Sequence, residues 1–405
     1  MKSICITINF FPFSGGARAI VNEVWRALHE KFEIHFLTIP PLDYSGPYII
    51  HKLQKMRRHI VPCNPGLFPL NFCYMLIGLI KLLKLNKRYH FNVILAQDGV
   101  FTGFYSAVVG KLTGTKVIIM DYGATTNFLS DEYWNFQNVV TSRSRRTLIR
   151  LHTFLLRKTA FIIIKITAKI VNRIAVLGYE LTKIYNQLNV PNSKIRTIQY
   201  SVDEKFYSPL PYEYIIARRQ ELGITSDSIV VNVTCRLSQE KGIEYLLPAL
   251  KQAIEKNSKI VCLVIGMGSM YSSASTFITE HNLGNRIQLM GDATPIRVRD
   301  LLQISDIFIY SGVTGSNISL AVLEAMAAKC AIVATNSPRS HEGLLANNRG
   351  IIVPIRNSAA IAKATILLAE DNSLRKLMGN NARRWVIGHH SLKALNESIT
   401  SLVVS

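Results

Sequence analysis

The sequence has no long apolar run and no clustered metal ligands, and we expect no leader segment. No uncharged apolar stretch reaches the roughly 20 residues that a membrane-spanning helix needs. The longest, residues 67–80, contains Pro69, Asn71 and Gly78, and we expect a core or interfacial helix there. The first residues alternate like a strand and lack the apolar core and cleavage site of a signal peptide, which predicts a cytoplasmic protein.

Cysteine and histidine are present without the spacing of a metal site. The six cysteines form no C-x-x-C pair, and Cys5, Cys262 and Cys330 lie in or beside apolar stretches, so we expect buried thiols. The ten histidines show no H-E-x-x-H spacing, and we expect His389 and His390, near the C-terminus, to lie on the surface. The sequence therefore predicts no metal site.

Acidic residues are scarce. The chain has 26 of them against 47 lysines and arginines, a net charge of +21 that calls for an acidic partner: nucleic acid, anionic lipid or a phosphorylated substrate. No acid lies between Glu132 and Glu180, where residues 143–173 place basic residues on an apolar background near helical spacing. This segment is either a basic amphipathic helix that rests on an anionic membrane surface or a core-packing helix with a basic solvated face. We expect no nucleic-acid partner, because the basic residues lack interleaved aromatics for base stacking.

The 405 residues, 48% of them hydrophobic, suffice for two domains. Apolar strands alternate with helical stretches, which predicts an α/β fold of two doubly wound, Rossmann-like domains facing across a cleft. We place the domains at residues 1–205 and 206–385, followed by a C-terminal helix at 386–405 that could pack back on the first domain. The expected strands cover residues 3–10, 32–37, 91–96, 116–120, 174–177, 194–199, 228–234, 259–265, 287–289, 307–310 and 331–334, and the expected helices 17–28, 103–113, 180–188, 242–253 and 295–303.

Residues 311–335 form the stretch around which the chain is organised. A polar loop follows the strand at 307–310, a helix begins near Ser319, and a buried strand returns after Lys329. A helix that opens at the carboxyl end of a strand points N–H groups and its positive dipole end at a ligand, for which phosphate is the natural occupant. Glu324 lies on this apolar helix, where it could accept hydrogen bonds from ribose hydroxyls. It could equally be an ordinary acid that the dipole favours.

Basic residues and glycines follow other strands. Arg236 and Lys241 bracket a turn after the strand at 228–234, where two cations suit a diphosphate, although a solvated basic pair is the alternative. Gly266 and Gly268 would let a flat base or ribose lie against the backbone, but Tyr271 stands where a dinucleotide fingerprint has its third glycine. The Gly15-Gly16 pair after the first strand would either allow a ligand to approach the backbone closely or simply form a tight turn.

The order of these features resembles the retaining glycosyltransferases of family four, which have the two-domain fold called GT-B. The matching stretches are the Gly15-Gly16 loop and residues 175–209, 233–242, 264–269, 287–295 and 323–335. The resemblance implies transfer of a sugar from a nucleotide-diphosphate donor that the second domain binds.

Roles for individual residues follow from the resemblance. Arg236 and Lys241 match the pair that binds the donor diphosphate and stabilises the leaving nucleotide. Glu324 matches the second glutamate of the family's paired-glutamate motif and would hold the ribose. The further donor-binding positions are Gly15, Gly16, Gly266, Gly268, Ser319 and the backbone N–H groups of Leu320, Ala321 and Val322.

The sequence departs from the family at the two groups nearest the sugar. The first glutamate of the motif should stand eight residues before Glu324, where the chain has Ser316, so that Ser316 and Asn317 would contact the donor sugar. Tyr122 or Asp121 replaces the histidine of the first domain. The chain also has no D-x-D sequence to hold a divalent cation on the diphosphate, which predicts metal-independent transfer with the nucleotide sugar as co-substrate and no cofactor.

Two functions are compatible with this pattern. One is a retaining glycosyltransferase acting on a glycan or lipid-linked acceptor at the cytoplasmic face of the plasma membrane. The other is a catalytically silent sugar-nucleotide binder or partner subunit, which Ser316 and Tyr122 suggest.

Overall fold

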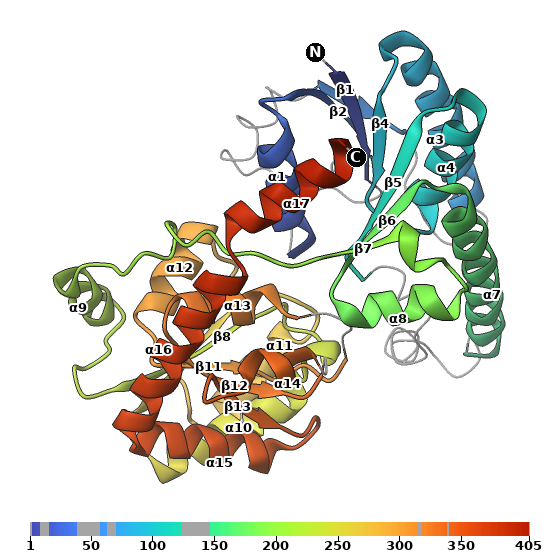
Figure 1. The fold of residues 1–405 in the computed structure, drawn as a ribbon. Coiled ribbons are helices and arrows are strands. Elements are labelled where there is room, and N and C mark those ends of the chain that lie inside the picture. The colour runs from blue at the N-terminus through green and yellow to red at the C-terminus, as the bar shows by residue number, and fades with distance from the viewer. Residues whose placement is uncertain are drawn as a thin grey trace. The chain divides into compact units, whose positions relative to one another are not determined.

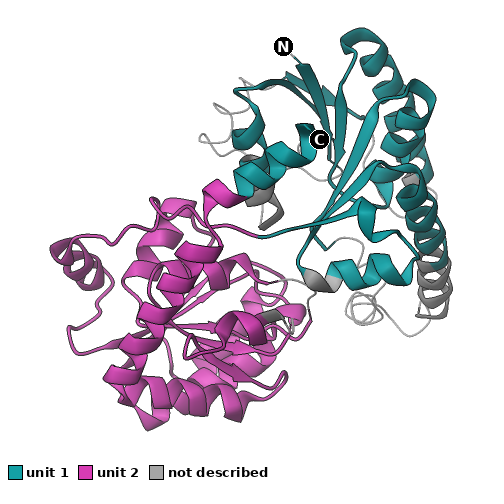
Figure 2. Ribbon diagram, in the orientation of Figure 1, with its two compact units in different colours: residues 1–199, 395–405 teal, residues 200–394 magenta. Residues whose placement is uncertain are grey.

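The structure is a computed structural model that describes residues 2–8, 16–38, 57–62, 70–123, 146–314, 318–337 and 340–404. It divides into two compact units (Figure 2): unit 1 comprises Met1–Gln199 with Leu395–Ser405, and unit 2 comprises Tyr200–Ala394. Our domain boundaries at residues 205 and 385 remain predictions; the division by compactness lies at residues 199 and 394.

Unit 1 is built on a seven-stranded sheet in which all neighbouring strands are parallel (Figure 1). The strand order is β3-β2-β1-β4-β5-β6-β7, with β1 in the interior of the sheet, as in a doubly wound fold. The strands are β1 (Lys2–Thr7), β2 (Phe32–Thr38), β3 (Arg57–Ile60), β4 (Val93–Ala96), β5 (Lys116–Asp121), β6 (Arg173–Leu177) and β7 (Ile195–Ile198).

Helices connect the parallel strands of unit 1, because a parallel pair needs a crossover. Helix α4 packs against both α3 and α7. The last helix, α17, returns to this unit, and Lys116 Nζ donates to the carbonyls of Leu402 and Val403 at 3.3 and 3.4 Å. The helices are α1 (Gly16–Leu28), α3 (Leu70–Tyr89), α4 (Phe101–Thr113), α7 (Arg146–Ile170), α8 (Tyr179–Gln187) and α17 (Leu392–Val404).

Unit 2 contains a second all-parallel sheet, in the order β10-β9-β8-β11-β12-β13. Its strands are β8 (Ile229–Thr234), β9 (Ile260–Ile265), β10 (Ile287–Gly291), β11 (Ile307–Tyr310), β12 (Ala331–Thr335) and β13 (Ile351–Val353). β9 reads IVCLVI and is buried throughout, since helices on both faces of a parallel sheet leave no side for polar residues. The two parallel α/β units confirm the predicted fold class.

The helices of unit 2 begin with clear capping signals. Thr294 accepts a hydrogen bond from the Arg297 N–H at the start of α12, and Asn357 and Asp371 cap α15 and α16 in the same way. The helices are α9 (Tyr212–Glu221), α10 (Ile243–Lys256), α11 (Tyr271–Glu280), α12 (Pro295–Gln303), α13 (Leu320–Ala327), α14 (Ser340–Leu345), α15 (Ser358–Glu370) and α16 (Asn372–His389).

The expected surface position of His390 is wrong. Its side chain is buried, and its Nδ1 lies 2.8 Å from the carbonyl oxygen of Tyr200, while His389 is exposed as expected. Burial lowers the pKa of His390. Cys5, Cys262 and Cys330 are buried free thiols, whereas Cys73, on α3, is exposed. Within the described residues, no helix is both long and apolar enough to cross a membrane.

Candidate functional site

The predicted donor residues of unit 2 follow the carboxyl ends of neighbouring parallel strands. Arg236 comes after β8, Gly266 after β9 and Ser319 in the connection after β11. His341, which we did not predict, lies in the connection after β12. Because these strands are parallel, their carboxyl ends meet at one edge of the sheet, where ligands of open α/β folds bind.

The two glycines after β9 lie against the loop that follows β8. Gly266 has φ 131°, and a Cβ there would lie 1.9 Å from the Cys235 carbonyl oxygen; at Gly268 it would lie 2.2 Å from that of Leu237. The Leu237 N–H donates to the Met267 carbonyl at 2.9 Å, which ties the loops together. The need for glycine at both positions therefore comes from the approach of the protein's own backbone. Donor binding by this loop stays a proposal.

The turn that carries Lys241 is fixed to the loop after β11. A Cβ on Gly242, which has φ 68°, would lie 2.1 Å from the Ser311 carbonyl oxygen. The Ser311 hydroxyl donates to the Lys241 carbonyl at 2.7 Å, and the Val313 N–H donates to that of Glu240 at 3.1 Å. These bonds hold the backbone of Lys241 beside the start of the loop that follows β11.

Arg236 is already paired within its own loop. Its guanidinium lies 2.5 Å from Glu240 Oε1, and 68% of its side chain is exposed. An ion pair this exposed contributes at most about 1 kcal/mol, so a diphosphate could displace Glu240 at little cost.

A chain of contacts links Lys241 to the start of α13. Lys241 Nζ lies 5.7 Å from the centroid of the Tyr310 ring, and that ring meets the His341 ring edge-on at 4.9 Å. His341 Nε2 accepts from the Ser319 N–H at 3.2 Å, so this nitrogen is unprotonated. Burial, together with the charge of Lys241, lowers the pKa of His341 to about 4. A neutral histidine thus supports the entrance of α13, a role that we did not predict.

The first N–H groups of α13 are not all available to a ligand. The N–H of Val322, which the resemblance assigns to the phosphate, donates to the Ser319 carbonyl at 3.1 Å. Leu320 and Ala321 are the first two residues of the helix, where N–H groups have no intrahelical acceptor. The phosphate role therefore rests on Leu320 and Ala321. Ser316 and Asn317 lie outside the described residues.

Glu324 is held by a residue that sequence reasoning missed. Burial raises the pKa of Glu324 to about 7, and the neighbouring Tyr207 hydroxyl partly offsets this rise. Tyr207 is itself buried, and its carbonyl accepts from Arg383 Nη1 at 2.7 Å. The only signal in the sequence was the aromatic pair Phe206-Tyr207 in the segment where the alternation of strands and helices breaks.

The match to known proteins decides the family. Residues 215–385, which contain the site residues of unit 2 described above except Tyr207, match the family model Glycos_transf_1, described as glycosyl transferases group 1. Solved glycosyltransferase structures share the fold of the whole chain, which is the GT-B fold. Unit 2 belongs to the glycosyl transferases group 1.

Relatives of this glycosyltransferase extend over nearly the whole chain. The uncharacterized glycosyltransferase MJ1069 of Methanocaldococcus jannaschii is 24% identical over 404 residues, which cover 95% of this chain and 94% of that protein. The N-acetyl-alpha-D-glucosaminyl L-malate synthase of Bacillus anthracis is 22% identical and covers 94% of this chain and 91% of its own. The crystal structure of Anabaena Alr3699/HepE in complex with UDP and glucose has a TM-score of 0.79 at 15% identity and covers 100% of both chains.

In unit 1 of this glycosyltransferase, Asp121 is one of the two candidate replacements for the family's histidine, and its carboxylate already forms hydrogen bonds within the unit. Asp121 is buried, and its carboxylate accepts from the Gly123 N–H at 2.9 Å and the Tyr185 hydroxyl at 2.8 Å. Tyr122 is half-buried, and its hydroxyl lies 3.5 Å from Met120 Sδ. Gly16 begins α1, and Gly15 lies outside the described residues.

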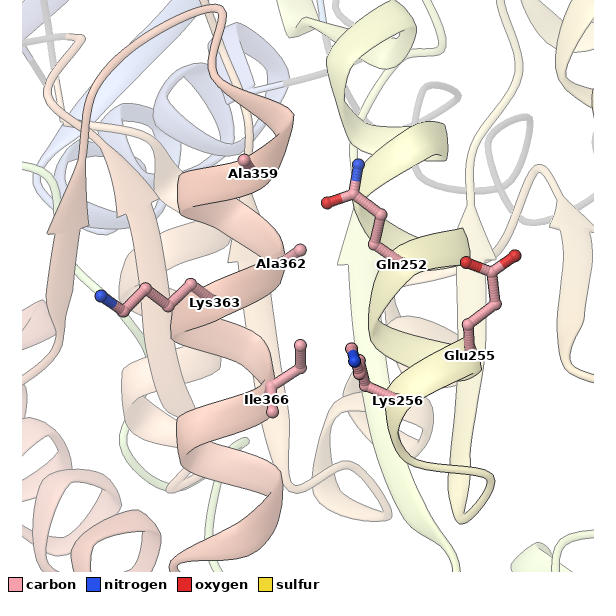
Figure 3. Close-up of a pocket in the computed structure, with 7 residues that line it drawn as sticks. All are labelled: Gln252, Glu255, Lys256, Ala359, Ala362, Lys363 and Ile366. Atoms are coloured by element: carbon pink, nitrogen blue, oxygen red, sulfur yellow. The ribbon is translucent and has the colours of Figure 1, made fainter.

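A pocket of about 480 Å³ lies elsewhere in unit 2 of this glycosyltransferase, between α10 and α15 (Figure 3). Gln252 points toward α15, whereas Lys363 points away from the gap. Since α10 begins at the carboxyl edge of the sheet, the last turns that line this pocket lie toward the opposite edge. The pocket lacks convergent polar groups and is not the donor site. Its lining comprises Gln252, Glu255, Lys256, Ala359, Ala362, Lys363 and Ile366.

Proposed function

We propose that this protein is a retaining glycosyltransferase that transfers a sugar from a nucleotide-diphosphate donor to a glycan or lipid-linked acceptor. Unit 2 binds the donor and unit 1 binds the acceptor. The observation that carries the proposal is the contact chain from Lys241 through Tyr310 and His341 to Ser319, which puts a cation and the opening of α13 at one edge of the sheet.

Charge develops on the diphosphate as the sugar leaves, and preorganised donors at that position lower the barrier. Arg236 and Lys241 supply positive charge, and the N–H groups of Leu320 and Ala321 supply oriented dipoles. The transfer uses no metal ion in this proposal. Its support is the missing D-x-D sequence.

Glu324 binds the ribose hydroxyls, and the Tyr207 hydroxyl holds its carboxyl group in place. By the family resemblance, Ser316, Asn317 and Tyr122 contact the donor sugar and select it through neutral hydrogen bonds. Gly15, Gly16, Gly266 and Gly268 allow the backbone to approach the donor.

The acceptor part of the proposal rests on charge. The basic segment 143–173 brings the enzyme to the cytoplasmic face of the plasma membrane, where a lipid-linked acceptor would be presented. Residues 146–170 of this segment form α7.

A second candidate is a catalytically silent sugar-nucleotide binder or partner subunit. Ser316, in place of the family's first glutamate, favours it, because a hydroxyl cannot supply the negative charge of a carboxylate.

One experiment separates the two. The protein is screened by thermal shift against UDP, GDP and a panel of nucleotide sugars, and donors that stabilise it are assayed for hydrolysis and transfer with and without EDTA. The proposal would be supported by turnover in the presence of EDTA, together with NMR spectra showing that the transferred sugar keeps the anomeric configuration it had in the donor. Stabilisation without turnover would favour the silent binder, and no stabilisation by any nucleotide would overturn both.

A further inference from the structure

Helices α3 and α7 form the outer layer on one side of unit 1. Both pack against α4, and most of α4 is buried, including Phe101, Tyr105 and Val109. Figure 1 shows α3 and α7 along the outer side of the same sheet. Their outward surfaces are therefore available to something beyond the fold.

The outward surface of α3 changes from apolar to basic along the helix. Phe72, Leu76 and Ile80 recur every four residues, and their exposed fractions are 46%, 58% and 47%. The same stripe continues into Lys84 and Arg88, both exposed. Residues four apart are neighbours on a helix surface, so the stripe is continuous and winds gradually around the helix.

The described part of α7 mixes the same two kinds of side chain. Phe161, Ile162 and Ile166 are 43%, 56% and 43% exposed. Lys165 and Lys169 stand among them, half-buried and exposed respectively. Exposed apolar residues in this number are unusual for a solvated surface and indicate a binding surface.

The two helices on this side of unit 1 carry no carboxylates. Between residues 44 and 179 the chain has only Asp98, Asp121, Asp131 and Glu132. Asp98 and Asp121 are buried; Asp98 accepts from the N–H groups of Val100 and Phe101 at 2.8 and 2.6 Å. Asp131 and Glu132 lie outside the described residues, and neither α3 nor α7 contains an acid.

We propose that α3 and α7 together form a docking surface for an anionic lipid bilayer, with the apolar stripe of α3 inserted at the level of the lipid headgroups. The proposal rests on the proposed function and extends its membrane contact from residues 143–173 to α3. Lysine is depleted in the cores of protein–protein interfaces, whereas interfacial membrane helices combine Lys and Arg with Phe and Leu. The mixture on α3 and α7 therefore fits a bilayer better than another protein.

The test is flotation of the full-length protein with phosphatidylcholine vesicles, with and without phosphatidylglycerol. We expect the protein to float with anionic vesicles at about 0.1 M salt and to be released at high salt, because surface charge is screened within a Debye length. Double variant L76Q/I80Q should reduce the bound fraction at least tenfold. The matched control is L367Q/L377Q, which changes two apolar residues of unit 2 that are 47% and 48% exposed, and it should float like the unchanged protein.

Charge and insertion are tested separately. Variant K165E/K169E should also reduce the vesicle-bound fraction at least tenfold. Variant K363E/K376E, which changes two exposed lysines of unit 2, should leave the bound fraction unchanged. For the insertion test, Cys63 and Cys235 are replaced by serine and a polarity-sensitive fluorescent dye is attached to the exposed Cys73. The emission maximum of the dye should shift to shorter wavelength when anionic vesicles are added.

Several outcomes would overturn the proposal. They are failure to float at low salt, equal binding to neutral vesicles, or flotation of L76Q/I80Q like the unchanged protein. If the protein does not bind vesicles, but sedimentation shows a dimer that the L76Q/I80Q substitutions dissociate, the surface binds a second copy of this chain instead. The thermal shift caused by nucleotides is measured on the same samples. If nucleotides stabilise the protein but it does not float, the docking surface is wrong and the sugar-transfer proposal stands. If nucleotides do not stabilise the protein, the sugar-transfer proposal fails independently of the flotation result.

Discussion

The hydroxyl of Tyr207 lies beside the carboxyl group of Glu324, 117 residues later in the chain, and lowers its pKa. The acid proposed to hold the ribose is therefore positioned before any ligand arrives. Burial raises its pKa to about 7, so its charge changes near neutral pH. A group that titrates there couples protonation both to folding and to ligand binding.

The first prediction concerns the pH dependence of stability. The pKa of Glu324 is about 7 in the folded protein and starts from 4.5, so the folded state binds more protons between these values. The contribution of Glu324 to stability is complete below about pH 4.5 and is lost as the pH rises through 7, up to roughly 3 kcal/mol at 1.36 kcal/mol per pKa unit. Glu324→Gln should flatten the melting temperature between pH 5 and pH 8. Glu280→Gln changes an exposed acid and should leave the pH dependence of the melting temperature as it is. If Glu324→Gln also leaves that pH dependence unchanged, the burial of Glu324 is contradicted.

The second prediction concerns Arg236. Arg236→Ala should lower kcat by roughly a hundredfold or more, the typical effect of removing a group that stabilises charge in the transition state. It should leave the melting temperature nearly unchanged, because the exposed pair with Glu240 contributes at most about 1 kcal/mol. Arg218→Ala is the matched control, since Arg218 pairs with Glu221 at 2.6 Å on α9. Activity of Arg236→Ala within a factor of two would rule out the assignment.

The third prediction concerns His341. His341→Phe keeps a ring of similar shape but removes the acceptor for the Ser319 N–H, which is bonded at 3.2 Å. A buried donor without a partner costs about 1–3 kcal/mol, so unfolding should occur at lower denaturant concentration. Nucleotide binding should weaken as the start of α13 loosens. Because the pKa of His341 is about 4, neither effect should vary between pH 6 and pH 8, unlike those of Glu324.

The sequence was sufficient for elements that local pattern determines. β9 is apolar throughout because both faces of its sheet are covered, and such runs identify strands directly. β3 escaped prediction because it is an edge strand of four residues, RRHI, with two exposed arginines. Its identity depends on pairing with β2 and not on its own composition.

Contacts between distant segments were beyond sequence reasoning. His390 was expected on the surface because it stands in a polar segment, yet it is buried against the carbonyl of Tyr200, 190 residues earlier. The support of Ser319 by His341 and of Glu324 by Tyr207 is of the same kind. The family resemblance identified the candidate donor residues, but only the folded chain shows which side chains hold them in place.

The last prediction concerns the backbone of the candidate site. At Gly266 a Cβ would lie 1.9 Å from the Cys235 carbonyl oxygen, and the residue has φ 131°, a conformation that residues with side chains rarely adopt. Gly266→Ala should therefore push the loop after β9 away from the loop after β8 and destabilise unit 2 by about 3 kcal/mol or more, since strained backbone alone costs of order 1–3 kcal/mol. Gly284→Ala is the control, because a Cβ there meets no atom within 4 Å. The measurement is denaturant unfolding of both variants: a clear loss only for Gly266→Ala would show that these glycines serve loop packing, whereas unchanged stability with weaker nucleotide binding would assign Gly266 to the ligand.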